Sequence, residues 1–129
     1  MYLVDSSVWI ALFLDDDTQH AKAVEAMDSI GDAHIQIPYG VISETVTVLS
    51  RKQSKELADK FIEYIRNNPQ IHTTSSFVSE DMRIFLAEKD RLAFVDAILK
   101  NLALSNGLVL VSFDKQLLNS LKKTGRVAH

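Results

Sequence analysis

The chain has 129 residues, of which 47% are hydrophobic and 24% charged, a composition that fits one globular domain spanning residues 1–129. It contains no cysteine, which excludes disulfides and thiolate-bound metal, and no apolar run near the roughly 18 residues of a membrane helix. The net charge of −3 argues against binding nucleic acid through a broadly basic surface, but leaves open an enzyme whose acidic site acts through metal cations.

The chain opens on a short strand and shows no basic segment followed by a long apolar run, so we expect a cytoplasmic protein without a signal peptide. The apolar run over 2–5 ends at a carboxylate, Asp5. A helix is expected to follow over 8–14. Ser6 and Ser7 are both good N-cap residues, so either one can cap this helix and leave the Asp5 carboxylate free.

Helices and strands alternate through the middle of the chain. An amphipathic helix over 18–30 is expected to turn Ala21, Val24, Met27 and Ile30 inward. The elements expected next are, in order, a strand over 35–38, helices over 39–50 and 53–67, a strand over 70–73 and a helix over 76–89.

The last third of the chain is the most apolar. A helix is expected over 92–105, followed over 108–111 by the kind of continuous apolar run found in buried parallel strands. A final helix over 115–123 and an edge strand over 126–128 complete the pattern. Because strands alternate with helices, we expect an α/β fold: a central parallel sheet with helices on both faces, in three layers.

Four of the 17 acids differ from the rest because they lie in apolar surroundings, and two of these four follow predicted strands. Asp5 ends the first strand and Asp114 follows the last core strand. Open parallel sheets bind ligands beyond the carboxyl ends of their strands, so both carboxylates can face one crevice. The alternative for each is a helix N-cap, which stabilises a helix by about 1 kcal/mol.

Asp96 is the third acid, and it is the only polar residue in the segment 92–99. A helix that is apolar nearly all round is expected to be buried. A lone buried carboxylate costs several kcal/mol unless it is paired or bound to metal. The alternative to a metal ligand is a salt bridge to Arg51, Arg91 or Lys100.

Glu44 is the fourth acid, on a predicted helix whose neighbouring residues are typical of a core. Its alternative is a structural pair with Arg51 or Lys52. Three or four carboxylates from separate elements can hold Mg²⁺ or Mn²⁺, hard cations that prefer carboxylate and water oxygens. Such an ion lowers the pKa of a bound water and orients it for attack on phosphorus.

Together these motifs resemble a known family. They are Val4-Asp5-Ser6-Ser7, Ile42-Ser43-Glu44, the segment 92–97 around Asp96, and Val111-Ser112-Phe113-Asp114. In order and spacing the chain resembles the PIN-domain ribonucleases, most closely the small VapC-type toxins of toxin–antitoxin pairs. The resemblance covers almost the whole chain.

The resemblance implies an α/β/α sandwich and an endoribonuclease that hydrolyses RNA phosphodiester bonds with Mg²⁺ or Mn²⁺. The catalytic and metal-binding acids that it implies are Asp5, Glu44, Asp96 and Asp114. It also implies supporting roles for Ser6 and for Ser112, which holds the place of a frequent threonine. VapC-type toxins cut RNA, often transfer RNA, usually form homodimers and are silenced by a cognate antitoxin that also binds DNA.

The chain departs from the family pattern just after Asp114. An additional acid is often found there, but Lys115, Gln116 and Leu117 follow in this sequence, which leaves one or two metal ions open. Arg51 lies one helical stretch from Glu44 and is a weak candidate for contacting RNA, with ordinary surface solvation as its alternative.

Two other functions are considered. The first is a non-catalytic PIN-like module that binds RNA or protein, against which the presence of all four acids argues. The second is a phospho-acceptor signalling domain, which needs an acid at the end of its mid-chain strand. This strand ends instead in His72-Thr73-Thr74, so the sequence favours the nuclease.

Overall fold

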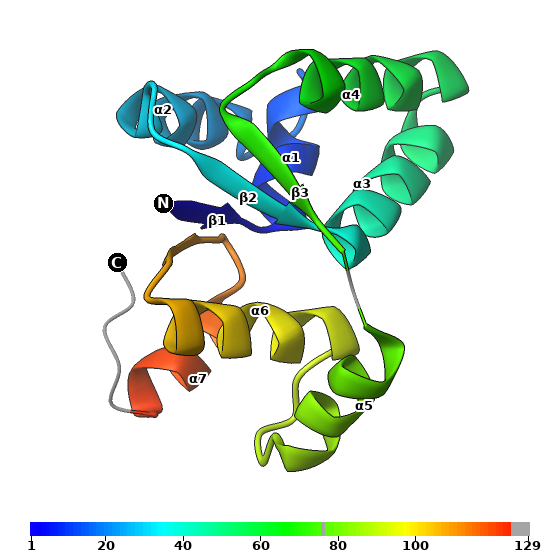
Figure 1. Cartoon of the computed structure of the whole chain (residues 1–129). Coiled ribbons are helices and arrows are strands. Elements are labelled where there is room, and N and C mark those ends of the chain that lie inside the picture. The colour runs from blue at the N-terminus through cyan, green and yellow to red at the C-terminus, as the bar shows by residue number, and fades with distance from the viewer. Residues whose placement is uncertain (76, 125–129) are drawn as a thin grey trace.

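A four-stranded parallel sheet forms the centre of the computed structural model, which describes residues 1–75 and 77–124 (Figure 1). The strands lie in the order β3-β2-β1-β4. Their bounds are β1 Tyr2–Val4, β2 Ile35–Pro38, β3 Ile71–Thr74 and β4 Val109–Val111. The parallel sheet expected from the sequence is therefore confirmed.

Helices cover both faces of this sheet. Figure 1 shows α1 to α4 gathered on one side of the sheet and α5 to α7 on the other. Their bounds are α1 Ser6–Phe13, α2 His20–Ile30, α3 Tyr39–Lys52, α4 Lys55–Asn67, α5 Val78–Ala87, α6 Phe94–Asn106 and α7 Lys115–Lys123. The three-layer α/β/α architecture is as predicted, and none of the helices in the described part of the chain has the length and apolarity needed to cross a membrane.

The core lies between the sheet and the two helical layers. Leu3, Ile35 and Leu110 are buried in β1, β2 and β4, as expected for strands covered by helices on both faces. On one face Trp9 is completely buried and its ring meets the edge of Phe61, with centroids 5.7 Å apart, which joins α1 to α4.

Most element bounds agree with the sequence prediction to within two residues, but α2 is rotated relative to it. Ala21 and Val24 are exposed, so the inward position predicted for these two residues is wrong. Ile30 is buried as predicted, and Ala23 is buried in place of Ala21. Packing against α1 selects a narrow stripe centred on a small residue, which periodicity alone does not locate. The edge strand predicted over 126–128 lies outside the described residues.

The sheet order decides where the site lies. β1 is the direct neighbour of β4, with Val4 opposite Val111, and the Asp5 backbone N–H donates to the Val111 carbonyl at 3.0 Å. The residues that follow these two strands therefore leave the sheet at one edge. Asp5 and Asp114 meet there although they are far apart in sequence.

Candidate active site

Asp5 is the most buried of the four acids, with 3% of its surface exposed. Its Oδ1 accepts a hydrogen bond from the Ser6 backbone N–H at 2.8 Å. Its Oδ2 accepts from the hydroxyls of Ser7 at 2.9 Å and Ser112 at 2.8 Å. Asp5 is itself the N-cap of α1, so the expectation that a serine caps this helix and leaves the carboxylate free is wrong. These neutral donors fix the carboxylate in one orientation without neutralising its charge.

Two serines connect the ends of β1 and β4. The Ser112 hydroxyl, which donates to Asp5, also accepts from the Asp114 backbone N–H at 2.9 Å. In the same way the Ser7 hydroxyl accepts from the Phe113 backbone N–H at 3.0 Å. Ser7 was not among the supporting residues predicted from the sequence. The available signal was a second hydroxyl two residues after an acid at a strand end.

Asp114 combines a structural position with a place in the cluster. Its Oδ1 caps α7 by accepting from the backbone N–H groups of Gln116 at 3.0 Å and Leu117 at 3.2 Å. The N-cap alternative is therefore correct for Asp114 as well as Asp5. A cap does not exclude a ligand, since each carboxylate has two oxygens and several lone pairs.

Glu44 lies on the exposed side of α3 and reaches toward Ser6. The Ser6 hydroxyl donates to Glu44 Oε1 at 2.5 Å and lies 3.5 Å from Asp5 Oδ1, so this serine stands between two of the predicted acids. No ion pair joins Glu44 to Arg51 or Lys52, whose side chains the structure describes. The structural pair considered for Glu44 is therefore not formed.

Asp96 occupies the first turn of α6 and is half-buried. The salt bridge considered for it is also not formed, because the buried Lys100 turns away to Glu88 at 2.9 Å and Asp90 at 3.6 Å. Within residues 1–75 and 77–124 no ion pair includes Asp96. An apolar helix thus carries a carboxylate with no cationic partner in that part of the chain.

The pKa of Asp96 shows that the four acids share one electrostatic environment. This pKa is raised from 3.8 to about 7, most strongly by burial and then by the negative charges of Asp5, Asp114 and Glu44 and by a side-chain hydrogen bond with Asp114. The sequence therefore selected four acids from different elements that come together at one edge of the sheet. Their mutual repulsion is the electrostatic state that a bound cation relieves.

The donor set suits a hard divalent cation. It consists of carboxylates supported by serine hydroxyls, with no histidine or cysteine ligand identified, which fits Mg²⁺ or Mn²⁺ better than Zn²⁺. In their present side-chain positions, no three His, Cys, Asp or Glu residues of the described segments are already spaced to hold one ion. The acids are close enough to interact electrostatically but have not converged on one point.

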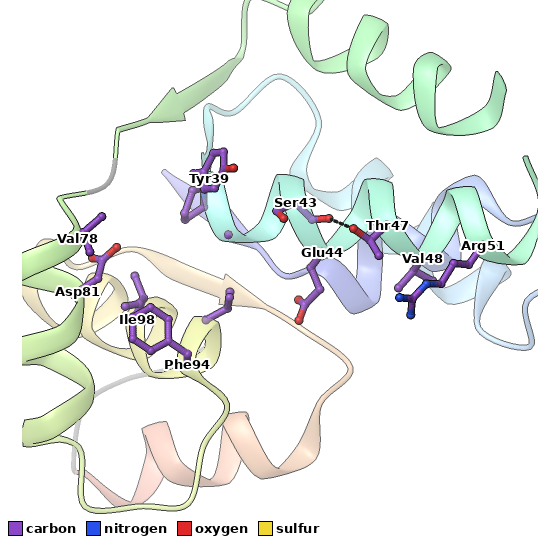
Figure 2. Close-up of a pocket in the computed structure, with 13 residues that line it drawn as sticks. Tyr39, Ser43, Glu44, Thr47, Val48, Arg51, Val78, Asp81, Phe94 and Ile98 are labelled. Atoms are coloured by element: carbon purple, nitrogen blue, oxygen red, sulfur yellow. Dashed lines mark hydrogen bonds between the residues drawn. The ribbon is translucent and has the colours of Figure 1, made fainter. Parts of the chain in front are cut away.

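A groove of about 620 Å³ extends from this cluster between α3, α5 and α6 (Figure 2). Glu44 lines it, so the groove and the acid cluster share a wall. Arg51 is exposed on the same face of α3, about two helical turns after Glu44, and also lines the groove. The weak candidate for RNA contact thus borders a surface that leads to the acids.

Comparisons with known proteins identify the family of this chain. The PIN domain family profile matches residues 2–123, a range that contains all four acids. VapC20 of Mycobacterium tuberculosis, a sarcin–ricin loop cleaving toxin, has a similar structure with a TM-score of 0.81 and 21% identity, over 100% of this chain and 98% of that one. PAE2754 from Pyrobaculum aerophilum matches with a TM-score of 0.60 and 23% identity, over 92% and 83% of the two chains. No curated protein sequence matches. The two solved structures share the fold, and the family profile spans nearly the whole sequence, so the chain belongs to the PIN domain family.

Proposed function

We propose that this chain is a metal-dependent endoribonuclease that hydrolyses RNA phosphodiester bonds and is the toxin of a toxin–antitoxin pair. The observation that carries the proposal is the placement of the four carboxylates at one edge of the sheet, where Ser6 and Ser112 link three of them and no ion pair of the described residues includes any of the four. Such an arrangement is unfavourable in a protein that binds no cation. Residues 1–129 act as one nuclease domain.

In this proposal Asp5, Glu44, Asp96 and Asp114 hold Mg²⁺ or Mn²⁺. When bound, the ion activates a water for attack on phosphorus and stabilises charge on the leaving oxygen. Asp5 is oriented for this task by Ser112 and Ser7, and Ser6 holds Glu44 toward Asp5. Asp96, whose pKa is about 7, would hold the ion in its deprotonated form, so metal affinity would rise with pH.

The proposed substrate is a folded RNA in the cytoplasm. The resemblance to VapC-type toxins favours transfer RNA, whereas the similar structure of VapC20 belongs to a toxin that cleaves the sarcin–ricin loop. Arg51 is the proposed phosphate contact, since it lies on the groove that begins at Glu44. Cleavage assays with transfer RNA and with a sarcin–ricin hairpin distinguish the two substrates.

Two protein partners belong to the proposal: a cognate antitoxin and a second copy of the chain. Support for the second copy comes from α5, which has no buried residue. Met82 and Leu86 lie one turn apart on this helix, and Leu86 is 83% exposed. Large apolar side chains left this open are typical of an interface.

The test is RNA cleavage by Asp5→Asn and Asp96→Asn variants in the presence of Mn²⁺. The cleavage rate of each variant is expected to fall more than about 100-fold, which exceeds the loss typical of mutating a residue that only supports a metal ligand. Neither variant is expected to arrest growth in cells. The matched control is Asp16→Asn, an exposed acid between α1 and α2, which keeps the wild-type rate. Cleavage at the normal rate by either site variant contradicts the proposal.

Thermal unfolding separates this function from the alternative of a non-catalytic module. Mn²⁺ is expected to raise the melting temperature of the wild-type protein and not that of Asp5→Asn, because a ligand stabilises only the state that binds it. A wild-type protein that neither gains stability from Mn²⁺ nor cleaves RNA favours the module.

A further inference from the structure

The groove beside the acid cluster has walls from three helices, and the function proposed above leaves most of it unexplained (Figure 2). Tyr39 and Ser43 lie on the α3 wall, and Phe94 lies on the α6 wall. Figure 2 shows Glu44 on α3 between Tyr39 at one end and Arg51 at the other. Anything that occupies this groove therefore lies next to one of the candidate metal ligands.

The groove exposes more aromatic surface than ordinary solvation explains. Tyr39 is 66% exposed and Phe94 is 43% exposed. Phe94 also contacts Phe85, with ring centroids 5.4 Å apart and planes tilted by 37°, so one side of the ring is supported by protein. Aromatic rings presented in this way stack on other flat groups without first having to be ordered.

The separation of the two walls is fixed by a close approach of backbone to side chain. A Cβ placed on Gly40 would lie 2.9 Å from Val95 Cγ2, so any other residue at this point of α3 would require Val95 or α6 to shift. Gly40 and Val95 both line the groove. The width of the groove and the distance of Glu44 from α6 are thus set by the same contact.

The polar groups along the groove suit a nucleotide. Ser43 is exposed, and the Thr47 hydroxyl donates to the Ser43 carbonyl at 2.8 Å, which leaves its oxygen lone pairs as acceptors. Arg51 supplies a guanidinium at one end. Asp81, half-buried on the α5 wall, supplies carboxylate acceptors at the other. The phosphate of a nucleotide can meet Arg51, the edge of its base can meet Ser43 or Asp81, and the face of its base can meet an aromatic ring.

We propose that this groove is the subsite for one unpaired nucleotide next to the scissile phosphate, with its base stacked on Tyr39 and Phe94. This proposal rests on the proposed nuclease function and adds the residues that select the RNA. A nucleotide is preferred to a protein segment as the occupant because the groove is continuous with the acid cluster through Glu44 and carries Arg51 on its rim. A base stacks on any aromatic face, so the subsite requires an unstacked loop nucleotide rather than one particular base.

Steady-state cleavage of an RNA hairpin tests the subsite with Tyr39→Leu and Phe94→Leu. Each is expected to raise KM about 10-fold, the size of one stacking contact, with kcat within about 2-fold of wild type. Tyr39→Phe keeps the ring and is expected to keep the wild-type KM. The matched control is Phe77→Leu, because Phe77 is 73% exposed but does not line the groove. Tyr39 is so exposed that its replacement leaves the core unchanged, and a melting temperature confirms this.

An abasic substrate completes the test. Removing the base of the nucleotide beside the cleaved bond is expected to raise the KM of the wild type and to abolish the difference between wild type and Tyr39→Leu. The subsite is contradicted if RNA is cleaved and Tyr39→Leu and Phe94→Leu have the wild-type KM. It is also contradicted if the KM of Tyr39→Leu differs from that of wild type by the same factor on the abasic and the intact substrate. Variants that change only self-association, measured by sedimentation, show a protein contact and also overturn it. An absence of RNA cleavage by the wild type contradicts the nuclease function instead.

Discussion

At the scale of single residues, the site depends on carboxylates that do two things at once. Asp5 and Asp114 each use one oxygen as the N-cap of a helix, and each lies in the acid cluster. Because both carboxylates are N-caps, their positions are fixed by the first turns of α1 and α7 and not by a flexible loop. Ser7 and Ser112 add cross-links between the two strand ends. A metal ligand held by caps and hydroxyls is pre-oriented before any ion arrives.

The pH dependence of stability gives a direct test of the cluster. Because the pKa of Asp96 is raised from 3.8 in the unfolded chain to about 7 in the fold, its ionisation opposes folding. The penalty is absent below about pH 4, grows as the pH rises from 4 to 7 and is complete above 7. Without metal, Asp96→Asn is therefore expected to stabilise the protein by about 1–2 kcal/mol at pH 8, a value reduced for solvent screening of this half-buried group.

Thermal unfolding in EDTA at pH 4, 6 and 8 measures this effect. The difference between Asp96→Asn and wild type is expected to vanish at pH 4 and to grow toward pH 8. With saturating Mn²⁺ at pH 8 the order reverses, because only the wild type retains the full ligand set. A constant difference across this pH range would show that the pKa of Asp96 is not raised in the folded protein.

At the scale of elements, the contact between α3 and α6 sets the geometry of the site. Glu44 is on α3 and Asp96 is on α6, and Gly40 allows these helices to approach at Val95. Two elements on opposite faces of the sheet are thus brought together at its carboxyl edge. Lys100 acts one turn further along α6, where its pairs with Glu88 and Asp90 hold the α5–α6 connection. The lysine therefore shapes the region without neutralising the acids.

Gly40→Ala tests the importance of this approach. The added methyl group meets a stiff, β-branched side chain, so the helices must separate, and we expect a loss of about 1–3 kcal/mol in unfolding free energy together with weaker Mn²⁺ binding. Denaturant unfolding and metal titration measure the two effects. Gly40→Ala combined with Val95→Ala removes the clash and is expected to restore Mn²⁺ affinity. Wild-type affinity in the single variant would show that this contact does not position Glu44.

At the scale of the whole molecule, helix α5 is the least integrated part of the described fold. None of its residues is buried, and its apolar residues Val78, Met82 and Leu86 are exposed. The opposite layer is different, because Trp9 and Phe61 lock α1 to α4 in the core. The groove lies between these two helical layers, with α3 on one wall and α5 and α6 on the other. A second copy of the chain that covers α5 would therefore lie beside the groove that leads to the acids.

Leu86→Asp tests whether α5 pairs with a second copy. A charge in the centre of an apolar interface is costly, so the variant is expected to shift from dimer to monomer at micromolar concentration. Light scattering after size exclusion measures the mass. The control is Val24→Asp, an apolar position on α2 that is 38% exposed, which keeps the wild-type mass. A wild-type monomer, or a dimer unaffected by Leu86→Asp, places the interface elsewhere or excludes it.

The sequence by itself determined the elements, their order and the choice of acids. Caps, apolar runs and helical periodicity are local, so they placed β2 and α7 at their observed bounds and marked Asp96 as an acid without local polar neighbours. The alternation of strands and helices then required a parallel sheet, and the four PIN-like motifs lie within the range matched by the family profile. Local physics therefore predicted the fold class and the candidate ligand set.

Only the tertiary structure decided which groups meet. Ser112 reaches Asp5 across 107 residues, Lys100 pairs with Glu88 rather than Asp96, and α2 buries Ala23 instead of Ala21. These outcomes depend on the order of strands and on how closely helices approach, and several partners satisfy the local chemistry equally well. The groove could not be predicted from the sequence for the same reason, because its walls come from three helices that are separate in sequence and meet only when packed.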